Sequence, residues 1–350
     1  MMRFLSLVSI ATVAACTAAD VQVSERVSTT ETAPVWRLAE QVSDVRAASC
    51  PDGVSYQKAQ SISIEAELIE AGIKSSASEN LSGLSLTGAW HLTSDNDEFG
   101  GLSGVDVMRS GSLLAISDDG KFVWIGIDPE TGAPDGIGSM AYMRDPDGDI
   151  FPRKRDADSE GLVFHDGIAF VSFEQDHRIA AYDLESCGVA AYGAPVVTLD
   201  KVVGGSVLRN NGGAEALTLV SDVLRVGFET HQTIGSPIGT VRTDGTLDAF
   251  QRTVQPSLYV LTGLDASDGL VAQVFRAYDP ARGARAIVRV YDGDTKIAEA
   301  QLKQPLPVDN IEAIAIDRRE DGGTRLWLLS DDNFSLEQRT LLLALDLDQE

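Results

Sequence analysis

A unit of about 50 residues that begins with an acidic residue recurs along the chain, and this repeat most constrains the possible folds. In each unit the acid precedes a short apolar strand pattern, a polar turn and a second strand pattern rich in β-branched or aromatic residues. The repeated acids are separated by 54, 55, 50 and 47 residues: Asp106, Glu160, Glu215, Asp265 and Glu312. Helical periodicity is almost absent. Several short strands per unit, repeated at this period, are typical of a β-propeller.

The sequence therefore predicts an all-β fold, and we expect a β-propeller of six blades. Five blades correspond to the five repeated units. Residues 58 to about 98 are long enough for one more unit, or for outer strands that close the ring with the C-terminal strand. Seven blades, or a β-sandwich that does not close into a ring, are the alternatives.

The N-terminus predicts export. Residues 1–15 carry a single charge, Arg3, followed by an apolar run that is too short to span a bilayer and is typical of a secretory signal peptide. The sequence VAAC at residues 13–16 resembles the bacterial lipobox. We therefore expect a lipid on Cys16 and an outer-membrane lipoprotein facing the periplasm, with ordinary signal cleavage as the alternative. Residues 16–50 would form a flexible tether, and residues 51–350 the propeller domain.

Two further cysteines remain, Cys50 and Cys187. In an oxidising periplasm they can form a disulfide, but the sequence leaves open whether they lie close enough to pair or remain free thiols.

The charge of the chain limits the class of partner. The formal net charge is −25, from 28 Lys and Arg against 53 Asp and Glu, and no segment carries a basic stripe. Nucleic acid is therefore excluded as a partner, and an anionic ligand would need bound cations. The lipid anchor is the only membrane contact that we expect, and the sequence gives no indication of the oligomeric state.

Propeller geometry predicts a metal site. The innermost strands line a central channel, so an acid repeated at the start of each becomes a ring of carboxylates, which cannot all remain ionised without a cation. Oxygen ligands of this kind suit Ca²⁺ better than Zn²⁺. Asp158 shares one face of an extended segment with Glu160. The ends of the second strands add further oxygen ligands, although turn preference alone also explains some of them: Asp118, Asp119, Glu174, Gln175, Asp176, Glu229, Asp331, Asp332 and Asn333.

Candidate bases for hydrolysis come from the same strand ends. His177 follows the sequence FEQD and His231 follows FET, so both can lie on the acidic face, together with Glu174. A structural role is the alternative for each histidine. No Gly-x-Ser-x-Gly motif occurs, which disfavours covalent serine catalysis.

Several of these motifs together resemble the phytase-like β-propeller proteins, often described as having an esterase-like activity. The resemblance covers roughly residues 85–350 and is carried by "FGGLSGVDV", "AISDDG", "RDADSEGLVF", "FEQDHRI", "GGAEALTL", "NIEAIAI" and "LLSDDNFSLEQRTLLLALDL". It implies a secreted or lipid-anchored six-bladed propeller with metal-dependent hydrolase activity. Its candidate channel residues are Glu160, Glu174, Glu215, Glu312, Asp331, Asp332, Asn333 and Arg339. The fourth unit departs from the pattern, because Asp265 lies beyond a Gly-Leu pair.

We expect a Ca²⁺-dependent hydrolase of esters or phosphoesters. The sequence Arg153-Lys154-Arg155 is the one basic cluster, and Arg155, Arg178 and Arg339 are the candidate substrate-binding residues. Simple esters and phosphoesters rank above phytate, because phytate would enter an acidic channel only as its calcium complex. The alternative is a cell-envelope binding or scaffold propeller that carries a structural Ca²⁺ and performs no chemistry.

Overall fold

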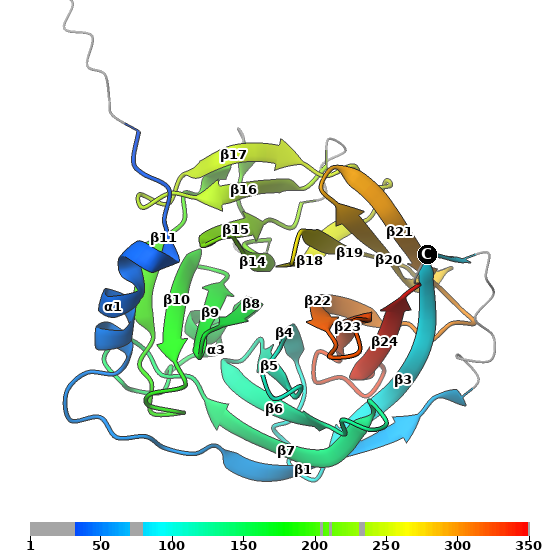
Figure 1. Ribbon diagram of the computed structural model, residues 1–350, viewed down its shortest axis with the longest axis horizontal. Coiled ribbons are helices and arrows are strands. Elements are labelled where there is room, and N and C mark those ends of the chain that lie inside the picture. The colour runs from blue at the N-terminus through cyan, green and yellow to red at the C-terminus, as the bar shows by residue number, and fades with distance from the viewer. Residues whose placement is uncertain (1–31, 71–79, 204–205, 210–211, 231–234, 349–350) are drawn as a thin grey trace, which may run out of the picture. The chain divides into compact units, whose positions relative to one another are not determined.

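The computed structural model describes residues 32–70, 80–203, 206–209, 212–230 and 235–348. Strands predominate, and the blade strands stand around a common centre (Figure 1). Cys16 and His231 lie outside the described residues, so their predicted roles remain predictions. No helix within the described ranges is long and apolar enough to cross a membrane.

Five four-stranded units make up the ring, each named here from its innermost strand outward. The first contains β4 (Leu102–Val107), β5 (Leu113–Ser117), β6 (Lys121–Ile127) and β7 (Pro134–Tyr142). The second contains β8 (Ser159–His165), β9 (Ile168–Phe173), β10 (Arg178–Asp183) and β11 (Ala194–Thr198). The third contains β14 (Ala216–Val220), β15 (Val223–Gly227), β16 (Pro237–Val241) and β17 (Leu247–Arg252). The fourth contains β18 (Val260–Ser267), β19 (Leu270–Asp279), β20 (Gly283–Asp292) and β21 (Thr295–Leu302). The fifth contains β22 (Asn310–Arg318), β23 (Thr324–Asp331), β24 (Leu341–Leu347) and β3 (Leu84–Ser94).

The innermost strands close into a ring of five. Each of β4, β8, β14, β18 and β22 contacts the next, and β22 contacts β4. The expectation of six blades is therefore wrong for the described chain. The reason is that residues 60–68 and 81–94 supply outer strands instead of another blade: β3 pairs with β24, β1 (Gln60–Leu68) bridges β3 and β7, and β2 (Leu81–Ser82) pairs with β21. This is the strand closure named above as the alternative for this segment.

Close approach of the inner strands explains the small residues that they carry. A Cβ atom added to Gly161 of β8 would lie 2.6 Å from the Ser172 Oγ and 3.0 Å from the Leu217 backbone nitrogen. On β4, a Cβ atom at Gly104 would lie 3.0 Å from the Glu160 carbonyl oxygen. Three of the strands that follow, β5, β9 and β23, are buried along their whole length. The small residues therefore allow five strands to pack around a narrow axis.

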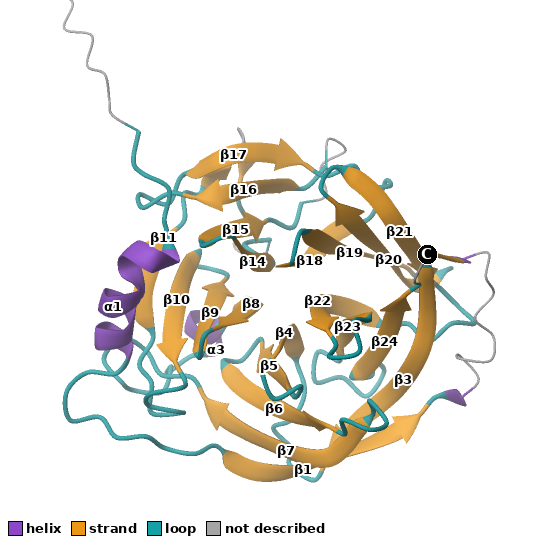
Figure 2. Cartoon of the chain, viewed as in Figure 1, coloured by secondary structure: helices purple, strands orange, loops and turns teal. Residues whose placement is uncertain are grey.

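The N-terminal segment packs against the outside of the second blade. Helix α1 (Leu38–Ser49) contacts β10 and β11, and Figure 2 shows it at the edge of the strand ring. Arg37 and Val35 form isolated bridges to the third blade. Residues 33–350 form one compact unit, so the predicted tether over residues 16–50 extends too far along the chain.

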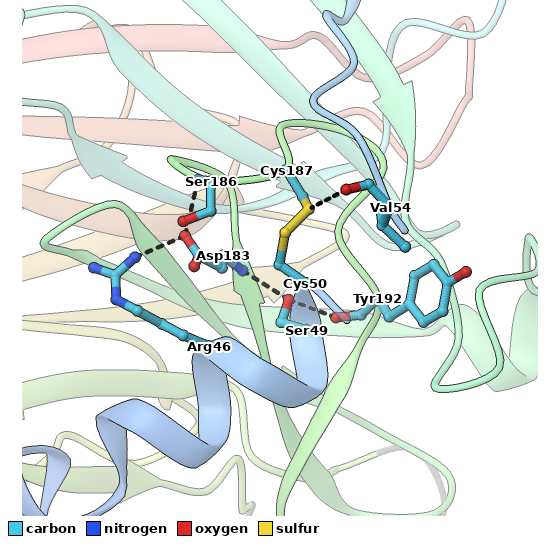
Figure 3. The surroundings of a disulfide bond; sticks show 8 residues. All are labelled: Arg46, Ser49, Cys50, Val54, Asp183, Ser186, Cys187 and Tyr192. Carbon is cyan, nitrogen blue, oxygen red and sulfur yellow. Dashed lines mark hydrogen bonds and ion pairs between the residues drawn. A yellow bond between two sulfur atoms is a disulfide. The ribbon is translucent and has the colours of Figure 1, made fainter. Parts of the chain in front are cut away.

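A disulfide fixes the end of this helix. Cys50 and Cys187 are bonded, with 5.8 Å between their Cα atoms (Figure 3). Beside it, the Asp183 carboxylate pairs with Arg46 at 2.8 Å, and its backbone N–H donates to Ser49 Oγ at 2.8 Å. The remaining elements are short: α3 (Lys154–Ala157), β12 (Val202–Val203) and β13 (Ser206–Val207). The cysteine pairing that the sequence left open is therefore present.

Candidate functional site

Three glutamates lie at one mouth of the central channel. The equivalent positions of the five inner strands are Ser103, Glu160, Glu215, Thr262 and Glu312, each followed by a small residue and then an apolar one. Together with those residues they line a constriction with a space of only about 10 Å³. Glu160, Glu215 and Glu312 also line a much wider cavity. The ring predicted from the repeat therefore holds three carboxylates at this level, not five.

Asp106 and Asp265 occupy a different level, three residues further along their strands. The Asp106 carboxylate accepts hydrogen bonds from the backbone N–H groups of Val107 at 2.6 Å and Phe164 at 2.5 Å. The Asp265 carboxylate accepts from the Ile316 N–H at 2.7 Å. Both aspartates thus join their own inner strand to the next one. Asp106 does not line the wide cavity, so the structure does not support its predicted place among the metal ligands.

The wide cavity, which we call the acidic cavity, has a volume of about 570 Å³. Its charged lining residues comprise eight acids and three bases: Asp118, Asp158, Glu160, Glu174, Glu215, Glu229, Glu312, Asp331, Lys154, Arg155 and Arg276. Inner strands supply the glutamates at its floor, and the ends of second strands supply its wall, as the repeat predicted. An excess of carboxylates around one cavity favours the binding of cations.

Glu160, Glu174 and Glu215 of the acidic cavity hold their protons to a higher pH than carboxyl groups in water do. Burial raises the pKa of Glu160 well above its usual range, and Glu174 and Glu312 raise it further. Burial, followed by Glu160 and Glu229, likewise raises the pKa of Glu215 well above its usual range. Glu174 is hydrogen-bonded to Glu215 and accepts from the Gly212 and Gly213 N–H groups at 2.5 and 2.6 Å. The cluster is therefore stable either with bound protons or with a bound cation.

Arg276 of β19 offsets the charge of two other carboxylates of the acidic cavity, Glu312 and Glu229. Its Nε lies 2.9 Å from a Glu312 carboxylate oxygen, and one terminal nitrogen lies 3.2 Å from Glu229. Its other terminal nitrogen donates to Asn310 Oδ1 at 3.0 Å. Burial raises the pKa of Glu312 to about 8, although Arg276 opposes this shift. Sequence reasoning missed Arg276, because it lies inside an ordinary strand pattern with its partners 47 and 36 residues away along the chain.

The rim between the first and fifth blades carries a second acid pair. Burial raises the pKa of Asp331 to about 7, with Asp118 and Asp332 adding to the effect. Asp118 pairs with Lys154, and burial still leaves the pKa of Asp118 above its usual value. Asn333 lines the same cavity, and its N–H donates to the Asp331 carboxylate at 2.6 Å.

Two predicted ligands have different positions. Asp158 lines the acidic cavity and accepts from Gln175 Nε2 at 3.1 Å, in agreement with its predicted face. Asp332 does not line the cavity. Its carboxylate accepts from the Gly101 N–H at 2.8 Å and from Thr340 Oγ1 at 3.0 Å, which fixes the loop after β23 to the first blade. The structure therefore gives Asp332 a structural role in place of the predicted metal ligation.

His177 is buried and does not line the acidic cavity. Its Nδ1 atom has no hydrogen-bond partner among the described residues. A Cβ atom added to Gly213, the glycine whose N–H contacts Glu174, would lie 2.8 Å from this nitrogen. Burial lowers the pKa of His177. His177 therefore packs beside the glycine that donates to Glu174, and its imidazole does not face the cavity.

The three predicted substrate-binding arginines do not lie together. Arg155 lines the acidic cavity. Arg178 lies over the Phe173 ring, 3.9 Å from its centroid, and donates to the Asp156 carbonyl oxygen at 2.7 Å. Arg339 pairs with Asp309 at 3.4 Å outside the cavity lining. Only Arg155 is therefore placed to contact a ligand in the cavity.

Within the described residues, no three His, Cys, Asp or Glu side chains converge closely enough to form a preassembled metal site. The donor atoms of the acidic cavity are nevertheless carboxylate and amide oxygens, the types that Ca²⁺ accepts.

Comparisons with known proteins address the fold and the family. Among solved structures, the PQQ-bound aldose sugar dehydrogenase from Streptomyces coelicolor shares 15% identity with a TM-score of 0.41, covering 73% of this chain and 98% of its own. The endo-arabinase from Bacteroides thetaiotaomicron shares 10% identity with a TM-score of 0.42, covering 70% and 92%. The Dos1 propeller shares 10% identity with a TM-score of 0.33, covering 75% and 74%. Similarity this low carries no argument about activity.

No curated protein matches the chain. Residues 97–237 match a family described as "Phytase-like: Esterase-like activity of phytase". This segment includes the first two blades and strands β14 and β15 of the third, and it contains Glu160, Glu174, Glu215 and Glu229 of the acidic cavity. The sequence resemblance is thereby confirmed over residues 97–237 of this β-propeller, which are similar to the phytase-like family.

Proposed function

We propose that this propeller is a Ca²⁺-dependent hydrolase of esters or phosphoesters that acts in the acidic cavity. The observation that carries the proposal is the gathering of eight carboxylates and three basic side chains around one cavity of about 570 Å³ at the channel mouth. A small ester fits a cavity of this size. The family description, with its esterase-like activity, supports the same class of reaction.

The residues best suited to hold the cation are the carboxylates that form no ion pair with Arg276. Glu312 and Glu229 are already compensated by the guanidinium. Glu160, Glu174 and Asp158 form the favoured ligand set, because Glu174 and Asp158 are among the carboxylates that raise the Glu160 pKa. Asp118 and Asp331 lie nearby at the rim. When bound, Ca²⁺ would supply Lewis acidity toward a carbonyl or phosphoryl oxygen.

The chain itself would position the reactants and move the protons. A carboxylate of the cluster, with Glu160 as our candidate, accepts a proton from the attacking water while the water oxygen bonds to the acyl carbon or phosphorus. The bond to the leaving alcohol then breaks, and that oxygen receives the proton, which yields an acid and an alcohol. Arg155 and Lys154 at the rim would orient an anionic or ester oxygen. His177 has no part in this scheme, because it lies outside the cavity.

A binding platform with a structural Ca²⁺ remains the second candidate. The apolar constriction below the glutamates favours it, because a channel closed by Leu162, Leu217 and Ile314 leaves only one mouth open to a ligand. A surface of this kind also suits capture of a ligand without chemistry.

We also propose export and lipid attachment at Cys16, which places the protein on the periplasmic side of the outer membrane. The Cys50–Cys187 disulfide supports an oxidising compartment, because such bonds persist there and are rare in the cytosol.

The deciding experiment measures hydrolysis by the chain from residue 17 onward. Aryl esters, lactones and phosphoesters are each assayed with Ca²⁺ and with chelator, for the wild type and for Glu160→Gln. We expect turnover that needs Ca²⁺ and is lost in Glu160→Gln. Glu67→Gln, an exposed glutamate on β1, is the matched control and should keep full activity. Absence of turnover in every condition, with Ca²⁺ still raising the melting temperature, would refute the hydrolase and favour the binding platform.

A further inference from the structure

A second cavity opens beside the acidic cavity. It has a volume of about 500 Å³ and lies over the start of β18 and the end of β19 in the fourth blade. Its lining consists of Glu229, Gln255, Pro256, Ser257, Leu258, Tyr259, Val260, Arg276, Ala277 and Tyr278. Glu229 and Arg276 line both cavities. Their ion pair is therefore the boundary between an acidic space and this neighbouring one.

The chemistry of the second cavity contrasts with that of the first. Beyond the shared ion pair, its lining has no charged side chain and is mainly apolar or aromatic. Leu258 and Tyr278 remain 67% and 72% exposed, although both line the cavity. Large apolar side chains left exposed beside a polar site mark a place where apolar ligand surface can be buried.

The wall of this cavity is held in place before any ligand arrives. Gln255 Oε1 accepts from Thr253 Oγ1 at 2.7 Å and from the Ser236 N–H at 3.1 Å, and its Nε2 donates to the Tyr259 carbonyl oxygen at 2.5 Å. These bonds close the turn that carries Leu258, whose φ of 74° is in the left-handed region that leucine rarely adopts. Because the turn holds Leu258 in this conformation, the position of its side chain is fixed before a ligand binds.

We propose that this second cavity is the subsite for the apolar acyl or alkyl group of the ester whose polar group occupies the acidic cavity. The inference rests on the proposed function for its reaction, but the binding preference stands on the cavity itself. Because the two cavities share Glu229 and Arg276 in their lining, one ligand that lies across this ion pair would place its polar end among carboxylates and basic side chains and its tail against Leu258, Tyr259 and Tyr278. The substrate class is then an amphipathic ester with a short-to-medium apolar chain.

The test measures binding separately from turnover. N-ethyl, N-butyl and N-hexyl acetamide, which resist hydrolysis, are titrated calorimetrically into the wild type in Ca²⁺. We expect the dissociation constant to fall about fourfold for each methylene buried, until the subsite is filled. p-Nitrophenyl acetate, butyrate and hexanoate give the corresponding series in kcat/KM.

Two variants examine the subsite itself. Leu258→Gly removes the side chain at a backbone conformation that glycine adopts without strain, and Tyr278→Ser removes an exposed ring. In both, the gain per methylene should fall below about twofold. Tyr56→Ser is the matched control, because Tyr56 is also exposed but lines a cavity elsewhere; its chain-length series should equal that of the wild type.

The outcomes separate the two proposals. Chain-length-dependent amide binding that is lost in Leu258→Gly and Tyr278→Ser supports the subsite, even if no ester is hydrolysed. Hydrolysis of aryl acetates without any chain-length dependence would overturn the subsite and leave the hydrolase intact. A chain-length dependence that is equal in the wild type and both variants would also overturn the subsite, because the tail would then bind elsewhere.

Discussion

Replacement of Arg276 by methionine should destabilise the protein in a manner that depends on pH. The change preserves most of the side-chain volume and removes the cation that lies 2.9 Å from Glu312 and 3.2 Å from Glu229. Removing one partner of a buried ion pair typically costs about 3–5 kcal/mol. Because both carboxylates line an open cavity, we expect the lower end, about 3 kcal/mol at pH 9.5, where Glu312 is ionised in the wild type. For a unit of roughly 320 residues this corresponds to a fall in melting temperature of about 4–5 °C.

The pH dependence follows from the direction of the pKa shift. The pKa of Glu312 is already raised to about 8 in the folded protein, and loss of Arg276 raises it further. A carboxyl group with a raised folded pKa destabilises the fold as pH rises from its unfolded pKa toward its folded pKa. At pH 5 Glu312 is protonated in the folded protein, so only lost hydrogen bonds and packing remain, about 1 kcal/mol. The folded pKa values of the wild type and the variant give different stabilities only above about pH 8, so the variant should be nearly normal at pH 5 and clearly weakened at pH 9.5.

The assay is denaturant unfolding at pH 5 and pH 9.5 with chelator present, followed by circular dichroism. Arg289→Met is the matched control, because Arg289 pairs with Glu299 at the same 2.9 Å on outer strands, where Lys296 also contacts the carboxylate. That variant should lose similar stability at both pH values. An equal loss at pH 5 and pH 9.5 for Arg276→Met, or no loss at all, would refute the view that Arg276 serves as the counter-charge of the cavity.

Three other changes test neighbouring parts of the structure. Glu160→Gln should raise the melting temperature at pH 8 in chelator and leave it unchanged at pH 5, because burial and nearby carboxylates raise the Glu160 pKa and glutamine has no charge to bury. In Ca²⁺ at about 100 times its dissociation constant, the wild type should gain about 2.7 kcal/mol of stability at pH 8, and Glu160→Gln should gain less. Asp106→Asn should lose about 1–3 kcal/mol in urea unfolding, because one of two backbone N–H groups loses its acceptor; a variant as stable as the wild type would contradict the structural role. Replacement of Cys50 and Cys187 together by serine should cost about 2–5 kcal/mol, measured against the oxidised wild type, and equal stability would show that the bond adds nothing.

The sequence predicted the architecture better than it predicted the number of blades. Acid-led strand pairs at a constant period made a propeller the natural solution, and the acids at Glu160, Glu215 and Glu312 do begin inner strands at one channel mouth. The blade count failed at residues 60–94 because β1 and β3 have the length and alternation of blade strands. Whether such strands start a new blade or join existing ones depends on pairing with β7 and β24, which no local pattern reveals.

The site was predicted in part for a similar reason. Carboxylates at strand ends could be found by alignment, whereas Arg276 could not, because its partners meet it only after the third, fourth and fifth blades have closed around the axis. Asp332 shows the opposite error. Its acidic neighbourhood resembles a ligand cluster, yet a backbone N–H and a threonine hydroxyl occupy its oxygens. The sequence shows where acidic residues occur, but not which of their carboxylates accept hydrogen bonds in the folded protein.

That distinction separates the acids of the inner strands into two kinds. Asp106 and Asp265 have short side chains that stay near the neighbouring strand, where backbone N–H groups satisfy their oxygens. Glu160 has a longer side chain that reaches the cavity, and the influences on its pKa are burial and other carboxylates, not hydrogen-bond donors. A buried carboxylate without donors costs stability unless a proton or a cation joins it. Glu160 is thus the acid whose presence the fold alone does not explain, and a proton or a cation would offset the cost of its burial.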